Sequence, residues 1–174
     1  MRCLKSGHLG AALQWALKAK DSELVSYIAE RYMLDYERQG RLKNLVMLRN
    51  LQDDMLISPH LLFLGKYCEF ARLFGEEKFS QAGDLLVELL EAGVVPKRFW
   101  ITVLTDALPL LHAPDQVTLS EEQTCTLMSC LEEICLSEFS GAEASPEGLP
   151  AAKAQIGVIR LALVQNLARA ILDN

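Results

Sequence analysis

Four pairs of adjacent carboxylates are the residues of this 174-residue sequence best suited to chemistry, since paired acids can exchange protons with a substrate. Adjacent residues of a helix point about 100° apart, so such pairs rarely converge on one substrate. We therefore interpret them as solvated faces and first-turn acids, not as catalytic residues. The pairs are Asp53-Asp54, Glu76-Glu77, Glu121-Glu122 and Glu132-Glu133.

The histidines and cysteines form no metal-binding or nucleophile motif. The three histidines are far apart, without HxxH or HExxH spacing, and the five cysteines form an odd set without CxxC. Three of those cysteines recur at steps of five and spiral around a helix, which favours packed, reduced thiols. Because GxSxG, P-loop and GxGxxG motifs are absent too, we expect no catalytic residue, metal or cofactor. The residues concerned are His8, His60, His112, Cys3, Cys68, Cys125, Cys130 and Cys135.

The charge is acidic and unevenly distributed. The chain has 17 Lys plus Arg and 23 Asp plus Glu, a net charge of −6, and residues 99–152 contain nine acids and no Lys or Arg. This balance argues against general binding of nucleic acid or of an anionic membrane, both of which need a basic face. We predict that the acidic side faces solvent or a basic partner. No run reaches the roughly 18 uncharged apolar residues of a spanning helix, so no transmembrane segment is expected.

Helical periodicity dominates the chain, which is 51% hydrophobic and only 7% aromatic. Helices that come in pairs of about 30–40 residues match the two-helix unit of stacked solenoids, although no strict repeat register survives. We therefore predict an all-α fold, an irregular α-solenoid of paired antiparallel helices in a single module over residues 1–174. The expected helices are 8–20, 21–39, 41–51, 59–74, 78–92, 96–112, 120–137 and 151–172, with a loop over 138–150.

Local signals fix several of these boundaries. Asp21 can cap the second helix, and Ser58-Pro59 places a hydroxyl and a proline at a helix start. Residues 120–123 (SEEQ) form a capping box. Gly93 follows a helix end, and Pro109 cannot donate a hydrogen bond to Thr105, so a kink or an end is expected near Leu108.

An aromatic stripe runs along the helix predicted over 59–74. Phe63, Tyr67, Phe70 and Phe74 recur at steps of four, three and four, on one side of a helix. Such a stripe could stack bases or ligands, but it lacks a basic groove nearby. Core packing is the preferred interpretation.

Six blocks of sequence together resemble one known family. They resemble the C-terminal part of the eighty-five-kilodalton nucleoporins of the Y-shaped nuclear pore subcomplex, a family also called Frount. The resemblance covers nearly the whole chain apart from about residues 139–151. The blocks are residues 6–13 (SGHLGAAL), 63–67 (FLGKY), 99–100 (FW), 104–111 (LTDALPLL), 122–124 (EQT) and 166–171 (NLARAI).

The resemblance implies a non-enzymatic scaffold subunit of the pore's outer ring that supports transport of mRNA and protein. It implies the tail module of an ancestral coatomer element, which meets other Y-complex nucleoporins at the hub of the complex. The implied location is the nucleus, at the pores of the nuclear envelope, with further pools in the cytoplasm and at kinetochores. The family's long N-terminal portion, which binds a β-propeller partner, is missing, so that partner is not expected to bind. The chain then looks like a fragment, a short isoform or a truncated gene model.

The last helix is where we expect a partner, because the open end of a solenoid exposes apolar surface unless something covers it. One apolar side of this helix carries Ile156, and a second carries Leu161, Val164, Ala168 and Ile171. The alternative is that neighbouring helices of the same chain bury both sides. The predicted partner-binding residues are Ile156, Ile159, Leu163, Val164 and Leu167.

Two other functions compete with the scaffold. The first is a cytoplasmic helical-repeat adaptor that binds a peptide or a receptor tail, since the Frount name is attached to the tails of chemokine receptors. The second is an all-α enzyme, which no convergent polar cluster supports. A continuous concave groove would favour the adaptor, a flat apolar terminal patch the scaffold, and a deep polar pocket the enzyme.

Overall fold

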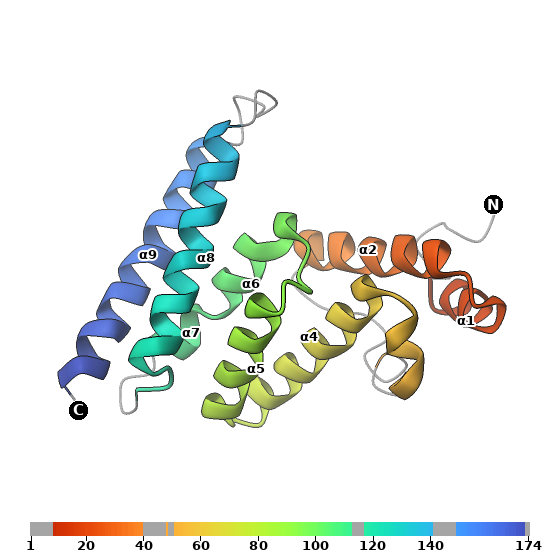
Figure 1. Cartoon of the computed structure of the whole chain (residues 1–174), viewed down its shortest axis with the longest axis horizontal. Coiled ribbons are helices and arrows are strands. Elements are labelled where there is room, and N and C mark those ends of the chain that lie inside the picture. Colours follow the sequence, from red (N-terminus) through yellow and green to blue (C-terminus); the bar gives the residue numbers. More distant parts are fainter. Residues whose placement is uncertain (1–8, 40–47, 49–50, 113–116, 141–148, 173–174) are drawn as a thin grey trace. The chain divides into compact units, whose positions relative to one another are not determined.

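The chain is all-α, as predicted, throughout the part that the computed structural model describes, which is residues 9–39, 48, 51–112, 117–140 and 149–172. Figure 1 shows the helices along the chain. They divide into two compact units, unit 1 over Met1–Gly75 and unit 2 over Glu76–Asn174. Each unit is described by itself, and the single module over the whole chain stays a prediction.

In unit 1, α1 packs against α2, α2 packs against α4, and η1 packs against α4. The Asp21 carboxylate accepts a 3.0 Å hydrogen bond from the Leu24 backbone N–H, so Asp21 caps α2 as predicted. The helix predicted over 41–51 lies outside the described residues, apart from Leu48 and Leu51. The elements are α1 (Leu9–Ala19), α2 (Ser22–Gln39), η1 (Gln52–Ile57) and α4 (Pro59–Gly75).

The aromatic stripe of α4 forms the core of unit 1. Phe63, Tyr67 and Phe70 are buried, and their rings follow one another at centroid distances of 5.6 Å. Tyr36 of α2 meets the Tyr67 ring edge-on, also at 5.6 Å. Rings at this spacing stabilise each other beyond the area they bury. The stripe is therefore a packing element, as the sequence predicts, and not a ligand platform.

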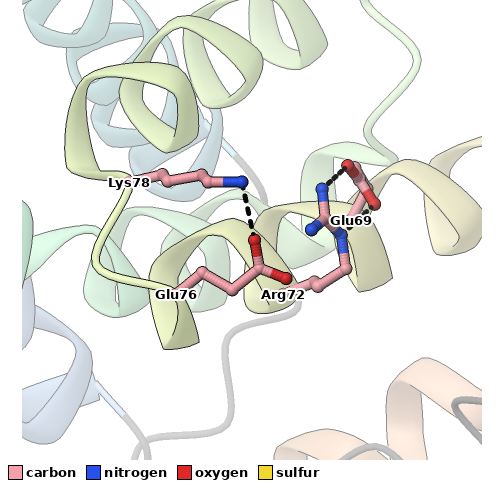
Figure 2. Close-up of polar contacts among 4 residues, drawn as sticks. All are labelled: Glu69, Arg72, Glu76 and Lys78. Atoms are coloured by element: carbon pink, nitrogen blue, oxygen red, sulfur yellow. Dashed lines mark hydrogen bonds and ion pairs between the residues drawn. The ribbon is translucent and has the colours of Figure 1, made fainter.

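Charged residues on the exposed side of α4 pair locally. Figure 2 shows the guanidinium of Arg72 holding both carboxylate oxygens of Glu69, with Arg72 Nε donating to Glu69 Oε2 at 2.9 Å. The same figure shows Lys78 Nζ at 2.9 Å from the Glu76 carboxylate, at the start of unit 2. Glu76 therefore forms an ion pair on the surface, as expected for a solvated acid.

Unit 2 is built around its two longest helices, α8 and α9, which run antiparallel and side by side in Figure 1 and pack closely. Helices α5 and α6 pack against α8, and α6 and α7 pack against α9. Helix α8 extends to Ser140 and α9 begins at Leu149, so both helices reach into the loop predicted over 138–150, whose residues 141–148 lie outside the described part of the chain. The elements are α5 (Phe79–Glu91), η2 (Lys97–Phe99), α6 (Trp100–Asp106), α7 (Leu108–Leu111), α8 (Glu121–Ser140) and α9 (Leu149–Leu172).

The helix predicted over 96–112 is divided into η2, α6 and α7. Helix α6 ends at Asp106 and α7 begins at Leu108 with Pro109 in its first turn, which confirms the break expected there. Trp100 begins α6, and its indole N–H donates a buried 2.8 Å hydrogen bond to the Val95 carbonyl. That bond fixes the chain at the entry to α6. Gly93 has φ 62°, a conformation that glycine accepts without strain, and α5 ends just before it.

The capping box of α8 is present as predicted. Ser120 N–H donates to Gln123 Oε1 at 2.9 Å, and Gln123 N–H donates to Ser120 Oγ at 3.2 Å. Gln123 Nε2 also donates to Asp84 of α5 at 2.6 Å. The cap therefore satisfies two backbone groups and also links α8 to α5.

Candidate partner-binding surface

Helix α9 carries the five predicted partner-binding residues, and the structure places them on different sides. Ile156, Ile159 and Leu163 are buried within unit 2. Leu167 is half-buried, and the side chain of Val164 is 46% exposed. Only Val164 and Leu167 are therefore reachable from outside, while the other three belong to the core.

Polar contacts fix the inner side of α9 against the rest of unit 2. Buried Asn166 donates from Nδ2 to the Leu119 carbonyl at 3.0 Å and to Thr124 Oγ1 at 2.8 Å. Arg169 donates to the Leu111 carbonyl, and Gln155 Nε2 donates to Thr105 Oγ1 at 3.3 Å. Because these partners lie on α6, α7, α8 and the segment before α8, the rotation of α9 about its axis is determined.

The opposite side of α9 is apolar and exposed. We call its large residues the outer edge of α9. Leu161 is 59% exposed and Leu172 83%. A row of apolar side chains along one helix is typical of a surface that another molecule covers. The outer edge consists of Val158, Leu161, Val164, Ile171 and Leu172.

The sequence prediction therefore combined residues from the two sides of α9, and partner binding by this helix stays a prediction. Leu161 and Ile171 were recognised as a second apolar edge, whereas Val158 and Leu172 were missed. The buried amide of Asn166 is the one sequence signal that could have oriented the helix. A polar residue among leucines marks the side that has hydrogen-bonding partners, and Val164 and Leu161 lie away from it.

The paired acids of α8 diverge, as expected for adjacent helical residues. Glu132 accepts a 2.8 Å hydrogen bond from Arg160 Nη2 of α9, and Glu133 forms an ion pair with Lys97 of η2. Two acids of the base-free region are thus paired within unit 2. The negative side predicted there is correspondingly weaker over the described residues.

The thiols offer no activated nucleophile among the described residues. Cys68 and Cys135 are buried, and Cys125 is exposed. Burial raises the pKa of the Cys130 thiol, and the charges of Glu133 and Glu91 raise it further. A raised pKa leaves less thiolate, which is the reactive form. Among the described residues, no group of three or more His, Cys, Asp or Glu side chains could hold a metal ion.

Residues Lys153–Leu172 of α9 are long and apolar enough to cross a membrane, by length and composition alone. The sequence prediction expected no such helix. Their mean hydropathy is 1.3, and a third of them are buried inside unit 2. The buried hydrogen bonds of Asn166 and the ion pair of Arg160 with Glu132 join this helix to the rest of unit 2.

Comparison with known proteins points to one family. The family model for Nup85 nucleoporins matches residues 1–133. The nuclear pore complex protein Nup85 of Danio rerio is 44% identical over 171 residues, covering 98% of this chain and 26% of the relative. Nup85 of Homo sapiens is 39% identical over 175 residues, covering 99% and 26%. Nup75 of Drosophila melanogaster is 36% identical over 118 residues, covering 68% and 18%.

The chain spans about a quarter of the length of the Nup85 relatives that it matches. The family model ends within α8, but the alignments with the Nup85 relatives extend over nearly the whole chain, α9 included. The outer edge of α9 therefore lies in a region that these relatives share.

Proposed function

Because the chain belongs to the Nup85 nucleoporin family, we propose that it is a non-enzymatic structural subunit of the nuclear pore complex. The observation that carries the proposal is the identity of about 40% with Nup85 proteins over nearly the entire chain. As a scaffold at the nuclear envelope it would support transport of mRNA and protein through pore assembly. The names of the relatives refer to the nuclear pore, and they give the cytoplasmic adaptor no support.

The proposal includes other Y-complex nucleoporins as partners, which the chain meets through α9. Val164 and Leu167 are the two predicted contact residues that remain reachable. Val164 lies one turn from exposed Leu161, and Leu167 lies one turn further along the helix, so a neighbouring subunit would cover these three residues together. Ile156, Ile159 and Leu163 support this surface from inside the unit.

Affinity purification of the tagged chain from cell extract tests the proposal. We expect other nuclear pore subunits to co-purify and the tagged chain to gather at the nuclear rim. Val164→Glu should reduce this capture at least fivefold, since it places a charge in the apolar contact. Leu56→Glu is the matched control, because Leu56 of η1 is also exposed but lies in unit 1.

Circular dichroism of both variants must match the unchanged chain. Capture of no nuclear pore subunit by the well-folded chain would contradict the proposed function. If the Val164→Glu variant captures nuclear pore subunits as well as the unchanged chain does, α9 is not part of the contact surface.

A further inference from the structure

Met55 of η1 lies directly against the backbone of α4 at Gly65. A Cβ atom added at Gly65 would lie 2.5 Å from Met55 Sδ and 2.8 Å from its Cε, closer than Cβ atoms approach other atoms in proteins. The thioether therefore occupies the space that any larger residue at position 65 would need. Gly65 is buried inside α4, so the end of the Met55 side chain contacts the helix itself.

This contact is one of few that hold η1 on α4. Helix η1 is a 3-10 helix of six residues that packs against α4, and 3-10 hydrogen bonds have poorer geometry than those of an α-helix. Asp54 and Leu56 are exposed, whereas Met55 and Ile57 are half-buried. If the Met55 contact is lost, Ile57 is the remaining side chain in the described part of η1 that is still partly covered.

The thioether of a half-buried methionine is accessible to small oxidants. Hydrogen peroxide transfers one oxygen atom to the sulfur: a sulfur lone pair forms the S–O bond, the O–O bond breaks, and water leaves. The product, methionine sulfoxide, is polar where the thioether was apolar. The backbone N–H groups around Gly65 already donate within α4, so they offer the new oxygen no hydrogen bond. The sulfoxide therefore favours water over the contact with Gly65.

We propose that Met55 is a redox-sensitive switch of unit 1, whose oxidation to the sulfoxide by hydrogen peroxide releases η1 from α4. Two reductases, one for each sulfoxide epimer, reverse the oxidation. With a dithiol as the reductant, the oxygen leaves as water and the dithiol becomes a disulfide. The switch shares no residue with the α9 surface of the proposed function and does not depend on it.

The other methionines provide internal controls. Met33 of α2 is 1% exposed, so peroxide should reach it slowly. Met128 of α8 is half-buried, as Met55 is, but it lies in unit 2. Peptide mapping by mass spectrometry follows the sulfoxide at each position. Met55 should be oxidised about ten times faster than Met33 or more, because reactivity follows exposure. Equal rates at Met55 and Met33 would overturn the switch.

Hydrogen–deuterium exchange of the purified 174-residue chain, before and after peroxide, tests the release of η1. The Asp54 N–H bonds to the Leu51 carbonyl at 2.8 Å. Amides of this segment should exchange about tenfold faster or more once Met55 is oxidised, since local opening exposes them. Unchanged exchange in a chain whose Met55 is fully oxidised would overturn the proposal.

Two variants assign the effect to one sulfur atom. Met55→Leu keeps a side chain of similar volume without sulfur, so its η1 amides should exchange slowly even after peroxide. Met128→Leu, the matched control, should respond to peroxide as the unchanged chain does. The cysteines are present in both variants, so their oxidation cannot cause the difference. Equal acceleration in the two variants would contradict the role of Met55.

Gly65→Ala tests the contact without an oxidant and does not depend on the folding of Met55→Leu. The added methyl group should push the flexible end of Met55 outward, so η1 should exchange faster before peroxide and Met55 should oxidise about threefold faster or more. Gly75→Ala, at the end of α4, adds a Cβ atom that meets nothing within 4 Å and should change neither rate. Equal rates in these two variants would overturn the contact.

Reduction of the oxidised chain distinguishes a switch from damage. Treatment with both sulfoxide reductases and dithiothreitol should return the exchange of η1 to its original rate. Fast exchange that persists after Met55 has been fully reduced would show irreversible damage and overturn the switch.

Discussion

Asn166 is the residue on which the packing of α9 depends most. Its buried amide joins α9 to the Leu119 carbonyl before α8 and to the Thr124 hydroxyl within α8. Thr124 in turn donates to the Ser120 carbonyl at 2.7 Å. One side chain therefore connects α9 with the first turn of α8 and the segment that leads into it.

We expect Asn166→Ala to destabilise the chain by about 1–3 kcal/mol, because it leaves a buried carbonyl without its donor. Gln165→Ala, the neighbouring amide on the exposed side, should change stability by less than about 0.5 kcal/mol. Urea unfolding followed by circular dichroism measures both. Equal effects of the two substitutions would show that the buried amide has no special part in packing.

At the scale of single residues, the sequence indicated which apolar residues line a helix, but not reliably which of them are buried. The aromatic stripe was assigned to the core because Phe63 and Tyr67 stand at helical spacing without basic neighbours. Ile159 and Val164 are both β-branched and apolar, yet one is fully buried and the other exposed. What separates them is the position of α8 and of the segment before it, which periodicity within α9 does not contain.

At the scale of elements, helix ends were the most predictable features. The signals at helix ends, such as Asp21, Pro109 and the capping box, act on neighbours within four residues. Four to five consecutive residues of sequence therefore suffice to recognise them. The division of the predicted 96–112 helix into three pieces was foreseen only in part. The break at Pro109 has a local cause, whereas the 3-10 turn η2 before Trp100 accompanies the indole's hydrogen bond to Val95, a tertiary constraint.

The capping box of α8 gives a prediction for one element. Ser120→Ala should lower the free energy of unfolding by about 1 kcal/mol, since the Gln123 N–H loses its acceptor. Ser129→Ala is the matched control: Ser129 is exposed in mid-helix and donates only to the Cys125 carbonyl one turn earlier. Chemical denaturation of the two variants should give a clearly lower midpoint for Ser120→Ala alone. Equal denaturation midpoints of the two variants would indicate that packing, and not the capping box, stabilises the start of α8.

At the scale of the whole molecule, unit 2 contains its own stabilising contacts. Buried residues of α9 such as Ile159 and Leu163 complete a core that α5, α6 and α8 begin. The hydrogen bonds of Asn166, and that of Arg169 to the Leu111 carbonyl, likewise join residues of this unit. The single module over residues 1–174 was predicted from the length of the chain, and it stays a prediction.

We therefore expect residues 76–174 to fold when expressed alone, with a helical spectrum and a cooperative thermal transition. Residues 76–148, which lack α9, should lose that cooperativity because Leu131, Ile134 and Leu104 lose neighbours. Calorimetry of the two fragments makes the comparison. A cooperative transition in the shorter fragment would mean that α9 is an appendage and not part of the core.

The place of α9 in the sequence also has a consequence for biosynthesis. Every element that α9 packs against, from α6 to α8, precedes it, so a growing chain presents the apolar inner faces of these helices before their cover has been made. Translation proceeds at about 5–20 residues per second, so the 24 residues of α9 take on the order of one to five seconds. During that interval the nascent unit is open to chaperones and to wrong partners. The apolar inner faces of α6, α7 and α8 therefore stay uncovered until α9 has been synthesised.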